Sequence, residues 1–377
     1  MRKKVLLLSE AIGTGHTKAA EALMQGISHI APSIHTKVLE VGQTLHPFTT
    51  KLLVNSYLKM IIQSPSLWRK MYHYNQNKPL CNWRKFAIYQ LFHRHIEALL
   101  NQEKPHLIIC THPFTSSSAS RLKRLGHQFT LCTLITDFHV HGAWVHSEVD
   151  VYLVSSEDVH DQLINMGIPK NRIAVTNFWT KKNKQEMRKK LKLKNIPSVM
   201  IMGGGLGLGG IQKLAHSLLK WKEKIQVIIC TGNNENLRSS LSRDGMFHHP
   251  HVHILGFVDR IDEWMDATDF LITKPGGLTC FEALSKGLPL YIFQPIQGHE
   301  ERNCDFLVNN HLAIKIDNTI DIDNIIEELL FSPPKMQVTH DRMMEFQQKA
   351  DSLASAEFIV DLLFRSNVPA NIRCQNK

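Results

Sequence analysis

The sequence predicts an α/β protein with two parallel-sheet domains, each Rossmann-like. Its 377 residues, 43% of them hydrophobic, are enough to bury two ordinary cores. Short apolar runs alternate with helical segments along most of the chain, which is typical of a parallel sheet covered on both faces. A glycine-containing turn follows the first apolar run of each half. We therefore expect two units that face each other across a cleft.

The first half opens as a strand, a turn and a helix. Val5–Leu8 is apolar throughout, and Ser9–Gly15 follows it as a loop. His16 begins the helix at the carboxyl edge of the strand, where open α/β sheets bind their ligands. A histidine at that place is either a hydrogen-bonding group of the helix start or a catalytic base. The apolar residues of this helix share one face, and they are Ala19, Ala20, Leu23 and Ile27.

A stretch without any acidic residue follows, between Glu40 and Glu97. Basic and aromatic side chains are interleaved in it, and one of its segments is amphipathic as a helix. This combination favours a helix that lies in the interface of an anionic membrane. A solvated helix pair packed on the sheet is the alternative, and nucleic acid is not the expected partner because no nucleic-acid-binding motif accompanies the charges. The residues that we assign to the membrane or the acceptor are Lys51, Lys59, Trp68, Arg69, Lys70, Trp83, Arg84 and Lys85.

Alternating helices and strands resume after this stretch. We expect a helix over Ile88–Leu99 and strands over His106–Cys110, Phe129–Thr136 and Val151–Val154. Polar residues gather at the end of the second of these strands, between Thr136 and Trp144. Such residues are candidates for substrate contact, although a core tryptophan with surface histidines gives the same pattern.

A basic linker is expected to join the two domains. Thr180–Lys194 contains the run KKNKQEMRKKLKLK, and dense runs of one charge are usually solvated. Part of it, Gln185–Leu193, has a helical pattern. We place an N-terminal domain at 1–178, the linker at 179–196, a C-terminal domain at 197–350, and a C-terminal helix with a polar tail at 351–377.

The second half repeats the opening of strand, turn and helix. Ser198–Met202 is an apolar run, and Gly203–Gly210 after it allows a phosphate or another backbone to approach closely. The next strand ends in Cys230–Thr231–Gly232, without the acidic residue that NAD-binding domains place there. Further strands are expected over Ile225–Cys230, Val252–Leu255 and Leu290–Phe293, and helices over Ile211–Trp221, Ile322–Leu330 and Ser352–Arg365.

The stretch Thr273–Glu282 is a candidate anion site. It follows an apolar run and opens an amphipathic segment, so two glycines stand between a strand and a helix. Gly276 and Gly277 allow backbone N–H groups and the positive helix end to close on a diphosphate, and Lys274 adds charge. Glu282 can accept hydrogen bonds from a vicinal diol such as a ribose. A Pro-Gly turn that only caps a core strand is the alternative.

Composition excludes several classes of protein. The formal net charge of +10 indicates an acidic partner, such as an anionic membrane, a phosphorylated substrate or nucleic acid. The seven cysteines include no CxxC pair, so neither a disulfide framework nor a zinc site is predicted, and a reducing cytosol fits best. No apolar run has the length of a signal peptide core or of a membrane span. We expect a cytoplasmic protein that associates peripherally with the inner face of the cell membrane.

With these residues in view, the chain resembles the lipid-directed branch of glycosyltransferase family 28. This branch includes the bacterial diacylglycerol glucosyltransferases and the plant monogalactosyldiacylglycerol synthases. The resemblance implies the GT-B fold, with the nucleotide held by the C-terminal domain and the acceptor by the N-terminal one. The matching strings agree in order and spacing from Val5 to about Leu312, and they are GTGHTKAA, TDFHVHGAW, MGGGLGLGG, TGNNENL, GFVDRIDEWMDATDFLITKPGGLTCFEAL and PIQGHEERN.

The resemblance also implies roles for single residues. His16 matches the general base that takes the proton of the acceptor, and Asp137 is a candidate to orient or assist it. Glu282 matches the acid that binds the ribose, while His299 and Glu300 match the residues that read the hydroxyls of the donor sugar. No metal is expected, because a helix N-terminus with a lysine supplies the charge that a UDP leaving group needs. The other matched positions are Gly256, Phe257 and Val258 around the uracil, and Lys274, Gly276, Gly277, Leu278 and Thr279 around the diphosphate.

The function implied is an inverting transferase that moves a hexose from a UDP-sugar co-substrate to a lipid, diacylglycerol first among the candidates. The usual Gly-Gln-Glu string of the family is Gly298–His299–Glu300 here, so the identity of the sugar stays open. A UDP-sugar epimerase of the same fold and a non-catalytic membrane- or nucleotide-binding relative are the alternatives. The sequence also leaves open the lipid, the number of sugars added and the oligomeric state.

Overall fold

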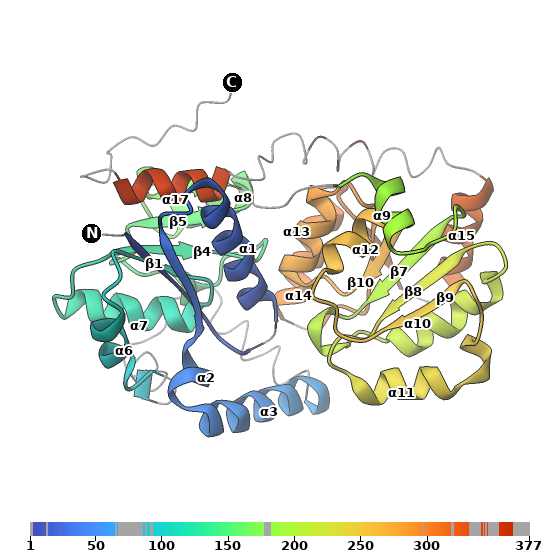
Figure 1. Ribbon diagram of the computed structural model, residues 1–377, viewed down its shortest axis with the longest axis horizontal. Coiled ribbons are helices and arrows are strands. Elements are labelled where there is room, and N and C mark those ends of the chain that lie inside the picture. Colours follow the sequence, from blue (N-terminus) through green and yellow to red (C-terminus); the bar gives the residue numbers. More distant parts are fainter. Residues whose placement is uncertain are drawn as a thin grey trace. The chain divides into compact units, whose positions relative to one another are not determined.

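A computed structural model describes residues 3–12, 14–64, 66, 86, 89–90, 93–176, 182–296, 298–317, 320–331, 341, 343, 345 and 354–364. The chain divides into two compact units (Figure 1). The first comprises Met1–Phe178 together with Asp351–Lys377, and the second comprises Trp179–Ala350. Each unit is built on a six-stranded sheet whose strand pairs are parallel, which confirms the predicted α/β class.

The first unit has the strand order β2-β1-β3-β4-β5-β6. Its strands are β1 Lys4–Ser9, β2 His35–Glu40, β3 Leu107–Cys110, β4 Thr130–Leu134, β5 Val151–Val154 and β6 Ile173–Val175. Strand β1 pairs with β2 on one side and with β3 on the other, so the order of the strands reverses there. The carboxyl ends of β1 and β3 therefore form a topological switch point, the place where open α/β sheets bind ligands.

Helices from both ends of the chain complete the first unit. They are α1 Gly15–Ile30, α2 Val41–Leu45, α3 Pro47–Gln63, α6 Ile96–Glu103, α7 Pro113–Arg124, α8 Glu157–Asn165 and α17 Ala354–Phe364, with short 3-10 turns η1 Gly142–Trp144 and η2 Lys170–Arg172. The predicted apolar face of α1 is confirmed, because its four residues are all buried. Helix α17 packs against α1 and belongs to this unit, as its red ribbon among the blue and green elements shows (Figure 1).

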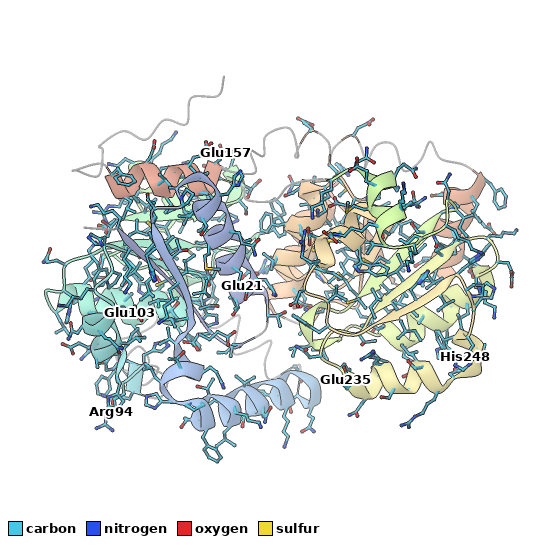
Figure 2. All side chains as sticks on the ribbon, in the orientation of Figure 1. Glu21, Arg94, Glu103, Glu157, Glu235 and His248 are labelled. Atoms are coloured by element: carbon cyan, nitrogen blue, oxygen red, sulfur yellow. The ribbon has the colours of Figure 1, made fainter. Side chains whose placement is uncertain are left out.

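A carboxylate at the end of α6 ties this helix to the first two strands. Glu103, labelled in Figure 2, is the last residue of α6. Its carboxylate lies 2.7 Å from Lys4 Nζ of β1 and 2.6 Å from Lys37 Nζ of β2. Hydrogen bonds from Lys37 and then from Lys4 lower the pKa of Glu103 to about 2. The carboxylate is therefore ionised at neutral pH, and it holds the amino ends of the strands in register.

The second unit has the strand order β12-β11-β10-β7-β8-β9. Its strands are β7 Ser198–Met202, β8 Gln226–Cys230, β9 Val252–Leu255, β10 Phe270–Thr273, β11 Leu290–Phe293 and β12 Ile314–Ile316. Strand β7 pairs with both β8 and β10, so the switch point of this sheet lies at the carboxyl ends of β7 and β10. The helices are α9 Lys184–Lys190, α10 Ile211–Leu218, α11 Glu235–Arg243, α12 Ile261–Ala267, α13 Gly277–Ser285, α14 His299–Asn309 and α15 Ile320–Phe331, with 3-10 turns η3 Gly204–Leu206, η4 Leu219–Trp221 and η5 Gly245–Phe247.

The basic stretch that we expect as a linker is largely built into the second unit. Helix α9 packs against α12, and Arg188 of α9 is buried and lies 2.6 Å from a carboxylate oxygen of Asp269. Lys182 and Lys190 lie 3.3 Å and 2.7 Å from Glu263. These charges are thus neutralised by carboxylates of the second unit, where the sequence predicts solvated side chains.

Two further expectations on secondary structure are wrong. The helix predicted over Ile88–Leu99 is not continuous, because His93–His95 are not helical and α6 begins only at Ile96. Strands β2, β6 and β12 are absent from the prediction. All three are edge strands, and an edge strand is less covered than a central one, so its sequence carries a weaker apolar signal.

Candidate active site

In the second unit the loops after β7 and β10 meet at the switch point. Gly276 is the N-cap of α13 and Gly277 begins this helix, whose first turn contains no acidic residue. The free N–H groups of the helix start therefore lie at this edge with their positive potential uncancelled. The side chain of Lys274 lies over the glycine-rich loop, since a Cβ added at Gly204 or at Gly209 would come within 3.4 Å of it. Backbone amides and one ammonium group thus lie together at the predicted anion site, and the binding of an anion there stays a prediction.

The glycine-rich loop requires glycine at defined positions. Gly207 has a φ of +61°, and a Cβ there would lie 2.1 Å from the carbonyl oxygen of Thr231. Gly210 has a φ of +70°, and a Cβ there would lie 2.4 Å from Oε1 of Gln294. The loop therefore packs directly on the loops after β8 and β11. Thr231 and Gln294 are missing from the predicted site, because these contacts depend on the strand order.

Lys274 forms an ion pair with Glu300, the second residue of α14. Glu300 is 1% exposed, and its other carboxylate oxygen accepts a hydrogen bond from Ile296 N at 2.9 Å. Asn303, one turn further along α14, donates to the carbonyl oxygen of Pro275 at 3.0 Å. Glu300 and Asn303 together fix α14 against the loop after β10. A contact of Glu300 with the donor sugar stays a prediction.

The other residues predicted for the donor lie along the same carboxyl edge. Glu282 is 5% exposed within α13, and His299 begins α14. Gly256, Phe257 and Val258 follow β9, which β8 separates from β7, so they lie two strands away from the switch point. Leu278 and Thr279 lie half-buried in the first turn of α13.

In the first unit the loops after β1, β3 and β4 bring polar side chains together. His16 is the second residue of α1, and its Nδ1 lies 3.2 Å from Thr136 Oγ1. The ring of His112 lies edge-on to that of His16, with 4.7 Å between the ring centroids, and the ring of Trp144 lies 6.2 Å away. The predicted base is therefore held at the switch point by groups from neighbouring strands. Asp137 follows Thr136 directly, and its role stays a prediction.

His112 is the residue of this cluster that the sequence prediction missed, whereas Thr136 and Trp144 belong to the segment predicted to contact the substrate. His112 is the N-cap of α7, and its Nδ1 accepts a hydrogen bond from Phe114 N at 3.2 Å. Burial, followed by the charges of His16 and His93, lowers the pKa of His112 well below the usual value. The available signal for His112 was its place two residues after the end of a buried strand, β3. Only the pairing of β1 with β3 places it beside His16.

A buried polar network lies at the same edge of the first sheet. Glu10 and His93 are both fully buried and are hydrogen-bonded to each other. The other ring nitrogen of His93 lies 2.5 Å from Ser118 Oγ of α7, and Gly42 N donates to Glu10 at 3.3 Å. Because each of these side chains has a buried partner, the network joins β1, α2 and α7 into one rigid support for the site.

Helix α3 is the longest described segment of the acid-free stretch. Two of its apolar side chains, one turn apart, lie in solvent, with Phe48 83% and Leu52 59% exposed. Lys51 and Lys59 of the same helix are also exposed. The remaining residues predicted for the membrane lie outside the described residues, and they are Trp68, Arg69, Lys70, Trp83, Arg84 and Lys85.

A cavity of about 730 Å³ opens at the opposite edge of the first sheet. Lys104 and His106, which precede β3, line it together with Phe129, which precedes β4, and Leu362 of α17. Ligands of open α/β sheets bind at the carboxyl ends of the strands, so we do not assign this cavity to the active site.

Two family models match the chain one after the other. Residues 16–177 match the model described as monogalactosyldiacylglycerol (MGDG) synthase, and residues 198–357 match the glycosyltransferase family 28 C-terminal domain. Over 373 residues the chain is 30% identical to a Bacillus pumilus protein named processive diacylglycerol beta-glucosyltransferase, with 95% of each chain covered. This chain belongs to the lipid-directed branch of glycosyltransferase family 28. The resemblance inferred from the sequence strings is thereby confirmed, and the chain is a glycosyltransferase.

Solved structures similar to this family 28 transferase include both transferases and epimerases. MurG from Acinetobacter baumannii has a TM-score of 0.59 at 14% identity, with 96% of this chain and 99% of that chain covered. The UDP-GlcNAc 2-epimerase from Neisseria meningitidis has a TM-score of 0.57 at 15% identity, with 96% and 99% covered. At such identities the likeness shows the fold alone, and it confirms the predicted GT-B type. The family membership rests on the sequence.

Proposed function

We propose that this family 28 transferase moves a hexose from a UDP-sugar to diacylglycerol, with inversion, at the cytoplasmic face of a membrane. The observation that carries the proposal is the anion site of Lys274, Gly276 and Gly277, at the switch point of the unit that matches the family 28 C-terminal domain. The name of the relative from Bacillus pumilus supports diacylglycerol as the acceptor and glucose as the first sugar to test.

The donor half of the reaction uses the second unit. The diphosphate of the UDP-sugar binds the N–H groups at the start of α13 and the ammonium group of Lys274, and Glu282 accepts hydrogen bonds from the ribose. These groups stabilise the negative charge that UDP gains as it leaves. Because they already supply positive charge, we expect transfer to survive removal of divalent metals with EDTA.

The acceptor half uses the first unit. The acceptor hydroxyl oxygen attacks the anomeric carbon, a new carbon–oxygen bond forms on the face opposite to UDP, and the bond to the β-phosphate oxygen breaks. UDP leaves with that electron pair, and the hydroxyl proton passes to His16. Since Nδ1 of His16 contacts Thr136 Oγ1 at 3.2 Å, we assign the proton to Nε2. Asp137 beside Thr136 is the candidate to assist the base.

Helix α3 supports a peripheral membrane contact. Phe48 and Leu52 are exposed apolar side chains that can enter the lipid interface, and Lys51 and Lys59 can pair with anionic headgroups. None of the helices in the described part of the chain combines the length and the apolar character of a membrane span. The enzyme would then reach its lipid acceptor from the membrane surface.

The test is a transfer assay with the full chain. Radiolabelled UDP-glucose and UDP-galactose are incubated in separate reactions with vesicles that contain diacylglycerol and an anionic phospholipid. Label in the lipid fraction is expected with one of the two donors, and His16→Ala should abolish it while UDP still binds by calorimetry. No labelled lipid with any UDP-sugar would refute the proposal. Conversion of the UDP-sugar to its epimer without acceptor or vesicles would favour the epimerase instead.

A further inference from the structure

A second histidine lies beside the proposed base, and the proposed function gives it no role. His112 is 5% exposed, and its ring stands edge-on to that of His16 with 4.7 Å between the ring centroids. Both residues come from loops that follow the paired strands β1 and β3. His112 thus occupies the switch point of the first sheet, where the acceptor is expected.

The hydrogen bond of His112 to the backbone fixes its tautomer. Its Nδ1 accepts from Phe114 N at 3.2 Å as the N-cap of α7, and a ring nitrogen that accepts a hydrogen bond carries no proton. Burial above all, and then the charges of His16 and His93, lower the pKa of His112 and keep the ring neutral. A neutral imidazole without a proton on Nδ1 carries it on Nε2. His112 is therefore a fixed N–H donor.

Within the described part of the chain, this donor is not used. Among the residues that the structure describes, Phe114 is the one hydrogen-bond partner of the His112 side chain, and its N–H donates to Nδ1. Nε2 of His112 is also not sealed from solvent. Nε2 of His253, in contrast, is buried without a hydrogen-bond partner. An N–H group that is fixed, neutral and accessible beside a base is suited to hold a substrate oxygen.

We propose that His112 orients the lipid acceptor by donating a hydrogen bond from Nε2 to one of its oxygens, next to the hydroxyl that His16 deprotonates. This inference rests on the proposed function, which supplies diacylglycerol as the acceptor. Diacylglycerol carries ester carbonyl oxygens close to its free hydroxyl, and a carbonyl oxygen accepts from a neutral N–H without a charged partner. The two histidines then have different roles, because their surroundings make His112 a hydrogen-bond donor and leave His16 as the base.

A purely structural role for His112 as the N-cap of α7 predicts different results, and two substitutions separate the roles. His112→Asn places an amide oxygen near the position of Nδ1, so it keeps the cap, since asparagine is among the best N-cap residues, but it has no donor at the position of Nε2. His112→Gln reaches the position of Nε2 with an N–H group and loses the cap. If His112 orients the acceptor, His112→Asn should impair catalysis. His112→Gln should instead impair stability.

The experiment measures transfer kinetics with mixed vesicles and the thermal midpoint of each variant. We expect His112→Asn to lower kcat/KM for diacylglycerol roughly tenfold, as for a lost hydrogen bond, with KM for the UDP-sugar and the Tm unchanged. His112→Gln should keep most of kcat/KM and lower the Tm by roughly 2–4 °C. The inference would be overturned if His112→Asn had the kcat/KM of the wild type. It would also be overturned if kcat/KM fell for both substrates alike and in proportion to a lowered Tm.

The chain offers a matched control residue, His106, at the opposite end of β3. His106 precedes β3, and its Nδ1 accepts from Lys4 N at 3.2 Å, the same type and length of bond as at His112. His106→Asn lies at the amino edge of the sheet, so it should leave both substrates' kinetics at wild-type values. A wild-type enzyme that labels no lipid would overturn the proposed function and this inference together, whereas an active wild type with an unimpaired His112→Asn overturns this inference alone.

Discussion

Replacing Lys274 by methionine removes a charge that is paired with Glu300 in the fold and that we propose binds the diphosphate of the donor. The side chain of Lys274 is 14% exposed and that of its partner Glu300 is 1% exposed. Removal of one partner from a buried ion pair leaves an uncompensated charge and costs about 3–5 kcal/mol of unfolding free energy. Loss of a charge-assisted hydrogen bond to the diphosphate costs a further ~1.5–3 kcal/mol of binding, or roughly 10- to 150-fold in the Kd of UDP.

A double substitution separates the two effects. In Lys274→Met with Glu300→Gln the buried charge is gone, and the glutamine can still accept the hydrogen bond of Ile296 N. We expect most of the lost stability to return in urea unfolding, while calorimetry shows UDP affinity as weak as in the single Lys274 variant. Recovery of wild-type UDP affinity in the double variant would refute the direct contact of Lys274 with the diphosphate. Lys220→Met is the control, because its ion pair with Asp323 is much more exposed, with side chains 54% and 25% accessible, and such a pair contributes at most about 1 kcal/mol.

Three further predictions concern the ribose, the membrane and pH. Glu282→Ala should weaken UDP binding by roughly 1.5–3 kcal/mol with the fold intact, and an unchanged calorimetric affinity would contradict the ribose assignment. Reversing Lys51 and Lys59 to glutamate should weaken binding to anionic vesicles by at least about 1 kcal/mol per lysine, and equal partitioning of the wild type onto neutral vesicles would count against an electrostatic contact. Because burial lowers the pKa of His112 in the folded chain, the unfolded chain takes up that proton first as the pH falls below about 6.5. The free energy of unfolding should then decrease by up to about 1.4 kcal/mol per pH unit from this residue, and urea titrations at pH 7 and 5.5 should show a smaller decrease in His112→Asn.

Central strands were predictable from the sequence because burial on both faces leaves a continuous apolar run. Val151–Val154, Ser198–Met202 and Leu290–Phe293 have the bounds that the sequence predicts. The edge strand Val252–Leu255 also has its predicted bounds, although it is only partly buried, because its residues are still mostly apolar. The edge strand β2 reads HTKVLE and is only partly covered, so its sequence lacks that signal. The prediction that the basic side chains of α9 are solvated is wrong for a related reason. Glu263 and Asp269, which neutralise them, are more than 70 residues away in the chain.

Site residues divide in the same way between local and distant causes. The position of Lys274, Gly276 and Gly277 between a strand and a helix start was predictable because all of these features lie within one short segment. Their binding of an anion stays a prediction. Thr136 and His16 are 120 residues apart in the chain. They meet because they follow β4 and β1, which lie on either side of β3 in the sheet. Such a contact has no counterpart in local pattern, so the sequence points to the neighbouring Asp137, and not to Thr136, as the partner of the base.

Each sheet has its switch point beside its first strand, β1 or β7, although the two strand orders differ. The residues around the two switch points suit them to different ligands. In the second unit the loop after β7 consists mostly of glycine, so backbone amides, a helix start and Lys274 present positive charge to an anion. In the first unit the groups around His16 are a threonine hydroxyl, a tryptophan ring and a neutral histidine, which suit a neutral hydroxyl and the movement of its proton. A glycosyl transfer requires both environments, because UDP leaves as an anion while the acceptor arrives uncharged. It follows that removing the charge of Lys274 should weaken the binding of UDP, and that removing the N–H donor of His112 should lower kcat/KM for the lipid.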